Sequence, residues 1–143
     1  MPHRSRLAIL LLDLPPEHHA AGRDFWSAAT GLPVQPDDTD QNWSSLGSLA
    51  DGFHLEVQRT GPGTPPRWHV DVETDDIPAE VARLEALGAR RLADMGRFWQ
   101  MTDPAGLVFC VVGVQTGDDF ERHATTWPDP GGVPSRRWPV LGS

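Results

Sequence analysis

Two short segments of the chain alternate apolar residues with polar residues that could do chemistry. They span residues 53–58 and 68–73. Successive side chains of a strand point to opposite faces, so each segment is expected to have one apolar face and one polar face. The polar residues of the two segments are His54, Glu56, Gln58, His69, Asp71 and Glu73.

Glu56 and His69 are the residue types that most often move protons in enzymes. On the polar face they could act as an acid–base or hydrogen-bonding pair without a metal, and His54 could join them. The alternative is a half-solvated antiparallel sheet, in which these side chains are ordinary polar surface groups. Both interpretations require the segments to be strands.

The composition excludes several classes of function. A net charge of −8 and a pI of about 5.0 argue against nucleic-acid binding and against anionic membrane surfaces. The chain has no lysine and no tyrosine, which excludes Schiff-base chemistry on lysine and a tyrosine acid. The one cysteine, Cys110, cannot form an intrachain disulfide and fits a reducing cytosol, so we expect a cytoplasmic protein.

The N-terminus has two arginines before a short apolar run, as in a signal peptide. Asp13 interrupts that run, and we interpret residues 6–12 as a strand instead. No other apolar run approaches the length of about 18 residues of a membrane-spanning helix.

The chain contains an internal repeat. The segments 50–58 and 103–112 both read as a turn that closes on a glycine, followed by an apolar strand. Residues 6–13 can likewise be aligned with 67–74. This alignment places Ala8 on His69, and the first alignment places Glu56 on Cys110.

Each half of the chain is predicted to be a strand, a helix and three strands. The first half has a strand at 6–12, a helix at 17–30 that ends at Gly31, two short strands within 34–50 and a strand at 53–58. The second half has a strand at 67–74, a helix from Asp75 or Asp76 to Gly88, and strands at 90–93, 97–102 and 107–113. The fold class is therefore α+β, with modules at about 5–60 and 66–113 inside a domain at 1–113.

Residues 114–143 are rich in Pro, Gly, Trp and Arg. We predict an extended tail with one helical turn near 119–124. Its apolar residues are Phe120, Trp127, Val133, Trp138, Val140 and Leu141. Exposed apolar patches of that size usually mark a contact, so the tail is expected to pack on the domain or on a partner chain.

Three stretches resemble the vicinal oxygen chelate superfamily, and more closely its actinobacterial glyoxalase-like and bleomycin-resistance-type domains. They are DFWSAATGLPV at 24–34, WHVDVETDDIPAEVARLEALGAR at 68–90 and DPAGLVFCVV at 103–112. The resemblance implies two βαβββ modules in tandem. Their curled mixed sheet would form a cup that holds a ligand or metal, with the helices outside.

The resemblance also implies where metal ligands would lie, at Ala8, Glu56, His69 and Cys110. Glutamate and histidine are good ligands for zinc, nickel or iron, whereas alanine is none. Cys110 could be a ligand, or a small apolar core residue. We therefore expect no metal cofactor, with a site made of Glu56, His69 and Cys110 as the alternative.

The resemblance implies that Trp43 and Trp99 line the cup. Trp26 and Trp68 are instead expected in the core. His18 and His19 are expected to be exposed to solvent. Acidic and aromatic side chains favour a neutral or cationic small molecule, aromatic ones included. The expected function is a homodimeric binding protein that sequesters a ligand or performs modest acid–base chemistry. The alternative is a metal-dependent lyase, isomerase or dioxygenase.

Overall fold

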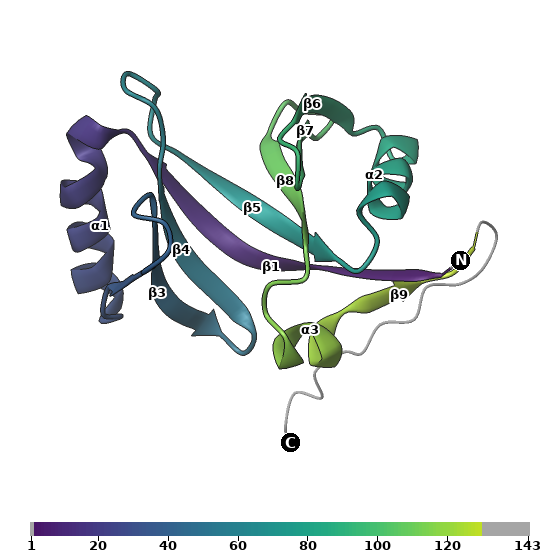
Figure 1. Ribbon diagram of the computed structural model, residues 1–143, viewed down its shortest axis with the longest axis horizontal. Helices are drawn as coiled ribbons and strands as arrows, with labels where there is room; N and C mark the ends of the chain where they lie inside the picture. The colour runs from purple at the N-terminus through teal and green to yellow at the C-terminus, as the bar shows by residue number, and fades with distance from the viewer. Residues whose placement is uncertain (1, 130–143) are drawn as a thin grey trace. The chain divides into compact units, whose positions relative to one another are not determined.

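The computed structural model describes residues 2–129 and shows an α+β fold (Figure 1). The first module contains β1 (His3–Leu14), α1 (Pro16–Thr30), β2 (Gln35–Pro36), β3 (Trp43–Ala50) and β4 (Phe53–Arg59). The second contains β5 (Arg67–Thr74), α2 (Ile77–Ala86), β6 (Arg90–Asp94), β7 (Trp99–Thr102) and β8 (Val108–Gly113). The predicted α+β class and the two βαβββ modules are confirmed.

The chain forms two compact units that nearly coincide with the modules. Ile9–Val70 make the first-module unit, and the described residues of 1–8 and 71–143 make the second-module unit. β1 and β5 contribute residues to both units. Among the described residues, no helix is both long and apolar enough to span a membrane.

In the first-module unit the strands pair in the order β2-β3-β4-β1. β1 runs parallel to β4, with Leu12 opposite Val57, whereas the other pairs are antiparallel. The core residues of this sheet are Leu12, Leu14, Leu46, Leu55 and Val57. Each such fully buried side chain stabilises the fold by about 1.5–3 kcal/mol relative to an exposed position.

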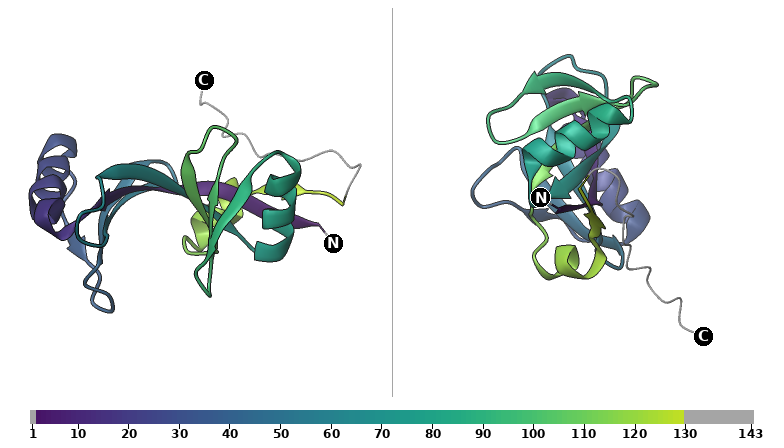
Figure 2. Two further views of the ribbon diagram at one scale, coloured as in Figure 1. Left: turned by 90° about the horizontal axis from the view of Figure 1, so that it is seen from above. Right: turned by 90° about the vertical axis from the view of Figure 1, so that its right-hand side faces the viewer.

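Helix α1 covers the apolar face of these strands (Figures 1 and 2). Pro16 occupies its first turn, and Gly31 ends it in the left-handed conformation at φ 74°, as predicted. Gly22 permits a close approach, because an added Cβ would lie 2.7 Å from Leu14 Cδ1. The helix is therefore fitted closely against the end of β1.

Helical spacing in the sequence predicts an inner face of α1 made of Ala21, Phe25 and Ala28 or Ala29, and the prediction for Phe25 was wrong. Phe25 is 61% exposed, and its neighbour Trp26 packs against the leucine core instead. His19, expected in solvent, is buried. Trp68, expected in the core, is 45% exposed and meets Trp26 edge to face, with ring centroids 5.1 Å apart.

In the second-module unit the strands pair in the order β5-β8-β7-β6. Val81 of α2 packs with Met101 and Val111 of this sheet. Asp76 caps the helix, since its side chain accepts a hydrogen bond from Ala79 N at 3.0 Å. The sequence spacing predicts an apolar stripe of Ile77, Val81, Leu84 and Leu87 on this helix. Leu87 is instead exposed, because the helix ends before it.

The chain continues through α3 (Asp118–His123) and β9 (Thr125–Trp127). α3 coincides with the predicted helical turn and buries Phe120. β9 pairs antiparallel with the start of β1, with Trp127 opposite His3, and Trp127 Nε1 donates to Ser5 Oγ at 2.8 Å. The predicted contacts of Val133, Trp138, Val140 and Leu141 lie outside the described residues.

Candidate functional site

Strand β4 separates an apolar from a polar face in the predicted way. Leu55 and Val57 are buried in the leucine core, whereas His54, Glu56 and Gln58 are half-buried on the other face. The neighbouring strand adds a residue to this polar face. Asp13 of β1 lies opposite Gln58 in the parallel register, which places it beside the predicted site residues.

Asp13 is the centre of a buried polar cluster in the first-module unit. Its Oδ2 lies 2.7 Å from His69 Nδ1 and accepts a hydrogen bond from Arg67 Nε at 2.9 Å. Both His69 and Asp13 are buried, the latter with only 1% of its surface exposed. Since Asp13 shares the face of Glu56, its partner His69 lies on that face too. Whether Glu56 and His69 line one cavity stays a prediction.

The two oxygens of Asp13 have different surroundings. Oδ2 has two partners, but Oδ1 is buried and, among the described residues, has no hydrogen-bond partner. A buried acceptor without a partner costs about 1–3 kcal/mol. The neighbours therefore fix the position of the carboxylate through Oδ2 but leave the acceptor sites of Oδ1 unused.

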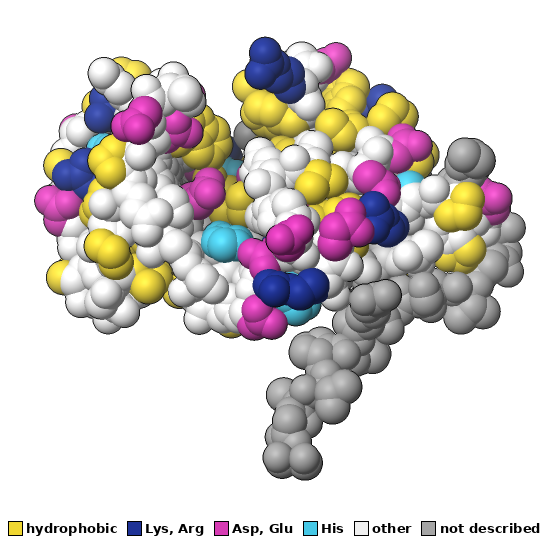
Figure 3. Space-filling model, turned by 60° about the horizontal axis from the view of Figure 1, so that its bottom comes forward, with side chains coloured by type: hydrophobic (Ala, Val, Ile, Leu, Met, Phe, Trp, Pro, Cys, Tyr) yellow, Lys and Arg dark blue, Asp and Glu magenta, His cyan; other side chains and the backbone are white. Residues whose placement is uncertain are grey.

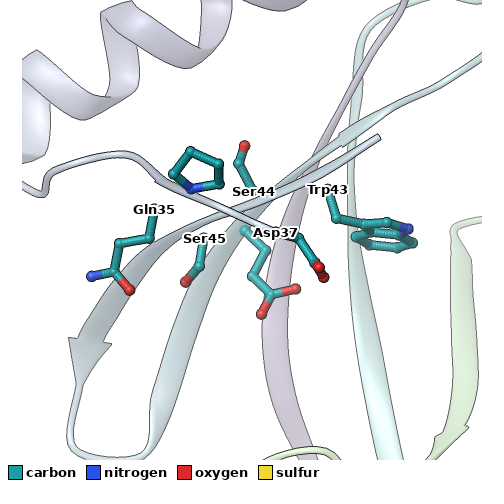
Figure 4. Close-up of a pocket in the computed structure, with 7 residues that line it drawn as sticks. Gln35, Asp37, Trp43, Ser44 and Ser45 are labelled. Atoms are coloured by element: carbon teal, nitrogen blue, oxygen red, sulfur yellow. The ribbon is translucent and has the colours of Figure 1, made fainter. Parts of the chain in front are cut away.

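A pocket of about 240 Å³ opens on the polar face beside Glu56 (Figure 4). The residues that line it are Gln35, Pro36, Asp37, Trp43, Ser44, Ser45 and Glu56. Pairing explains their convergence, because Ser45 lies opposite both Gln35 of β2 and Glu56 of β4. In Figure 4 the side chains of Gln35 and Ser45 point to one side of the strands and Ser44 to the other.

Asp37 gives the pocket a carboxylate that stays ionised. Hydrogen bonds from the Thr39 hydroxyl and from the backbone N–H groups of Thr39 and Asp40 lower the pKa of Asp37 below its usual value. With Glu56, the pocket therefore has two acidic groups and the indole of Trp43. Such a lining is suited to a small organic cation or a neutral aromatic molecule.

The second-module unit holds the remaining predicted residues. Trp99 packs beside the Val81 core, with the Arg91 guanidinium 4.9 Å from its ring centroid. Asp71 and Cys110 are buried, and their ligand atoms lie within 4.8 Å of one another. Cys110 faces away from α2, since its neighbour Val111 fills the core on the α2 side.

Glu73 has a structural environment. It is fully buried, and its Oε1 accepts hydrogen bonds from Arg6 Nε at 2.8 Å and from the Thr116 hydroxyl. Its Oε2 accepts from the backbone N–H groups of Gln115 and Thr116 at 2.9 and 3.2 Å. Both oxygens, expected from the sequence to face a ligand, are thus occupied by protein donors.

The donor set only partly fits the metal site that the superfamily implies. Ala8 is fully buried and offers no ligand atom. Glu56 and His69 in the first-module unit, and Cys110 in the second-module unit, carry atoms of the kinds that bind zinc. His69 would have to bind through Nε2, because Asp13 engages its Nδ1.

The residue that sequence reasoning missed is Asp13. The signal was present as a single acidic residue inside the apolar run LAILLLDL, where a charge on a buried strand needs partners. Arg67 and His69, which supply them, are more than fifty positions away along the chain. Their proximity depends on the tertiary fold and could not be read from local spacing.

Several solved structures are similar to this one. A Mn(II)-bound glyoxalase from Novosphingobium aromaticivorans matches 79% of this chain and 40% of its own, with 17% identity and a TM-score of 0.53. Methylmalonyl-CoA epimerase from Mycobacterium tuberculosis matches 76% of this chain and 87% of its own, with 11% identity and a TM-score of 0.52. At these identities the similarity shows the fold alone.

A third similar structure is 2,2',3-trihydroxybiphenyl 1,2-dioxygenase from Sphingomonas wittichii strain RW1, at 15% identity and a TM-score of 0.50. The match covers 78% of this chain and 41% of the dioxygenase. The chain thus spans about two fifths of the glyoxalase and of the dioxygenase. No curated protein sequence matches it.

A family of glyoxalase-like domains matches residues 10–112, which include both βαβββ modules apart from their outermost residues. The chain belongs to this family of glyoxalase-like domains.

Proposed function

We propose that this glyoxalase-like domain binds a neutral or cationic small molecule, aromatic ones included, in the pocket of the first-module unit. The observation that carries the proposal is the lining of that pocket, where Trp43 lies beside the carboxylates of Asp37 and Glu56. His54 and Gln58 share the polar face and would contact the larger ligands.

Electrostatics favours a cation over an anion at this position. An anion would meet two like charges in a partly desolvated pocket, where charges interact more strongly than in water. A cation over the indole of Trp43 gains about 0.5–2 kcal/mol from the ring quadrupole. On the face shown in Figure 3, basic side chains are interspersed with acidic ones, which supports the expectation that nucleic acid is not a ligand.

The bound molecule would either be sequestered or undergo modest acid–base chemistry through His69 and Glu56, with no metal required. We further propose a cytoplasmic homodimer that does not bind membranes. Asp71, Glu73 and Trp99 belong to the other unit, and they take no part in the proposed pocket.

Binding of three matched probes tests the charge argument. Benzyltrimethylammonium, benzyl alcohol and benzoate share an aromatic ring and differ in charge. Calorimetric titration is expected to rank them cation first, neutral second and anion last. Glu56→Gln and Trp43→Ala should weaken the cation, whereas Asp24→Asn, at an exposed carboxylate outside the pocket, should not. Preferential binding of benzoate would overturn the proposal.

The second candidate is a metal-dependent lyase, isomerase or dioxygenase that uses Glu56, His69 and Cys110. The observation that favours it is the buried position of Cys110, whose Sγ lies within 4.8 Å of a second donor atom, a carboxylate oxygen of Asp71. Elemental analysis of protein purified without chelators decides between the candidates. About one zinc, nickel or iron per chain, lost on substitution of Glu56 by Ala, would establish the metal-dependent alternative.

A further inference from the structure

We propose that Asp13 is a positioning residue that holds His69 in the tautomer with its proton on Nδ1. The lone pair is then on Nε2, and the Asp13–His69 pair forms the proton-transfer unit of the domain. This inference rests on the acid–base form of the proposed function and adds a residue that the sequence analysis did not include.

The geometry gives the direction of the hydrogen bond. His69 Nδ1 lies 2.7 Å from Asp13 Oδ2, and an ionised carboxylate can only accept. Nδ1 must therefore be the donor and carry the proton. In a neutral imidazole the second nitrogen, Nε2, is then the acceptor, as in other sites where a carboxylate orients a histidine.

Asp13 holds two side chains through one oxygen. Arg67 Nε donates to the same Oδ2 at 2.9 Å, beside His69 Nδ1. The carboxylate therefore fixes which edge of the imidazole faces β1, and it is the Nδ1 edge.

Asp13 is also poorly explained as a purely stabilising residue. Its Oδ1 is buried and has no hydrogen-bond partner among the described residues, and its charge is taken out of water at a cost. An apolar side chain on β1 would avoid both costs. What the carboxylate supplies, and an apolar residue would not, is an acceptor for His69 that cannot itself donate.

The proton transfer itself is balanced. His69 Nε2 takes an acidic proton from the bound ligand, and the electron pair of the broken bond stays on the ligand. The imidazole becomes an imidazolium whose Nδ1–H remains hydrogen-bonded to Asp13. Return of the proton from Nε2 to the ligand, at the same or another atom, regenerates the neutral pair without any oxidant or reductant.

Nitrogen-15 NMR of the histidine rings tests the tautomer directly. In the wild-type protein at neutral pH, His69 is expected to show a protonated Nδ1 and an unprotonated Nε2. In Asp13→Asn the neutral amide can donate to Nδ1 instead, and the Nδ1–H signature should be lost or mixed with the Nε2–H form. The exposed His18 serves as the internal control, because its signals should not change.

Arg67→Gln is the matched variant, since it removes a neighbour of Asp13 but keeps the carboxylate. Its His69 should retain the Nδ1–H form. An Nε2–H tautomer in the wild-type protein would overturn the inference even if no variant folds, and so would an unchanged Nδ1–H form in Asp13→Asn. Failure of the pocket probes to bind, with the tautomer as expected, would overturn the proposed ligand and leave the tautomer inference standing.

Discussion

Each unit of this protein contains a buried carboxylate that bonds to an arginine, but the two carboxylates are held differently. Glu73, in the second-module unit, accepts from Arg6, the Thr116 hydroxyl and two backbone N–H groups, so both of its oxygens are occupied. Asp13, in the first-module unit, uses one oxygen for Arg67 and His69 and leaves the other without a partner among the described residues.

The arginines differ as well. The Arg6 side chain is 7% exposed and pairs with the fully buried Glu73, whereas Arg67 is 43% exposed and can be hydrated. A saturated acid with a buried arginine is what a structural ion pair requires. An unsaturated acid that orients a histidine is more costly to the fold, and such sites tend to be functional. Residue type and burial alone would not distinguish the Glu73 pair from the Asp13 pair, since both are buried carboxylates bonded to an arginine.

The largest expected effect is that of Glu73→Gln on stability. The substitution removes the carboxylate that pairs with the buried Arg6 guanidinium and places an amide N–H₂ against donors. Loss of one partner of a buried ion pair costs about 3–5 kcal/mol. Urea unfolding should show this loss as a lower midpoint with an unchanged slope.

Glu121→Gln is the matched control for this prediction. Glu121 also bonds an arginine, Arg4, but it is an exposed pair. Exposed pairs contribute about 0.2–1 kcal/mol, so the control should remain near the wild-type midpoint. Equal losses in the two variants would show that burial does not set the strength of these pairs.

A smaller effect is expected for Asp13→Asn. The exposed Arg67 can be hydrated after the change, and Oδ1 has no bond to lose, so the loss should be about 1–3 kcal/mol. Urea unfolding beside Glu73→Gln measures the difference. If the two substitutions cost the same, Asp13 is a structural residue and the contrast between the units fails.

The sequence was sufficient to predict the two modules, but not the different surroundings of Asp13 and Glu73. The internal repeat and the glycines after each helix predicted the strand and helix order, because they are local signals. The alternation of His54, Glu56 and Gln58 likewise placed the polar face of β4 correctly.

The errors came from tertiary contacts. Phe25 and Trp26 are adjacent, and which of them faces the core depends on how α1 lies on β1 and β4. Trp68 is half covered by Trp26 instead of being buried, which only the helix position decides. Glu73 lies on the expected face, but the loop at 115–116 closes over its oxygens. No local pattern predicts that loop.

His19 extends the comparison to a buried base. It is buried, and its Nε2 has no partner among the described residues. Burial, followed by the nearby charges of Arg59 and Arg23, lowers the pKa of His19 below 6.5, against an opposing effect of Asp24. The folded protein thus binds this proton less readily than the unfolded chain, so stability is highest above pH 6.5 and falls as the pH drops through and below that value.

The free energy of unfolding can change with pH by at most about 1.4 kcal/mol per pH unit because of His19, since this histidine takes up one proton. Urea unfolding of the wild-type protein and of His19→Gln between neutral and mildly acidic pH measures it. The variant should lose less stability on acidification, whereas His18→Gln, at an exposed position, should follow the wild type. Parallel curves for all three proteins would mean that His19 is protonated equally in both states.

The smallest effect is expected for Gly22→Ala, which disturbs the neighbour of Asp13 without touching a charged group. The new methyl group would meet Leu14 Cδ1 at 2.7 Å, but that atom ends a flexible side chain that can rotate away. The strain of this shift opposes a gain of about 0.5–1 kcal/mol from replacing glycine inside a helix, so the net change should stay within about 1 kcal/mol. Since Asp13 keeps its carboxylate, the His69 Nδ1–H signal should persist in the NMR spectrum of this variant. Its loss would show that the packing of β1 against α1, rather than the hydrogen bond to Asp13, orients the histidine.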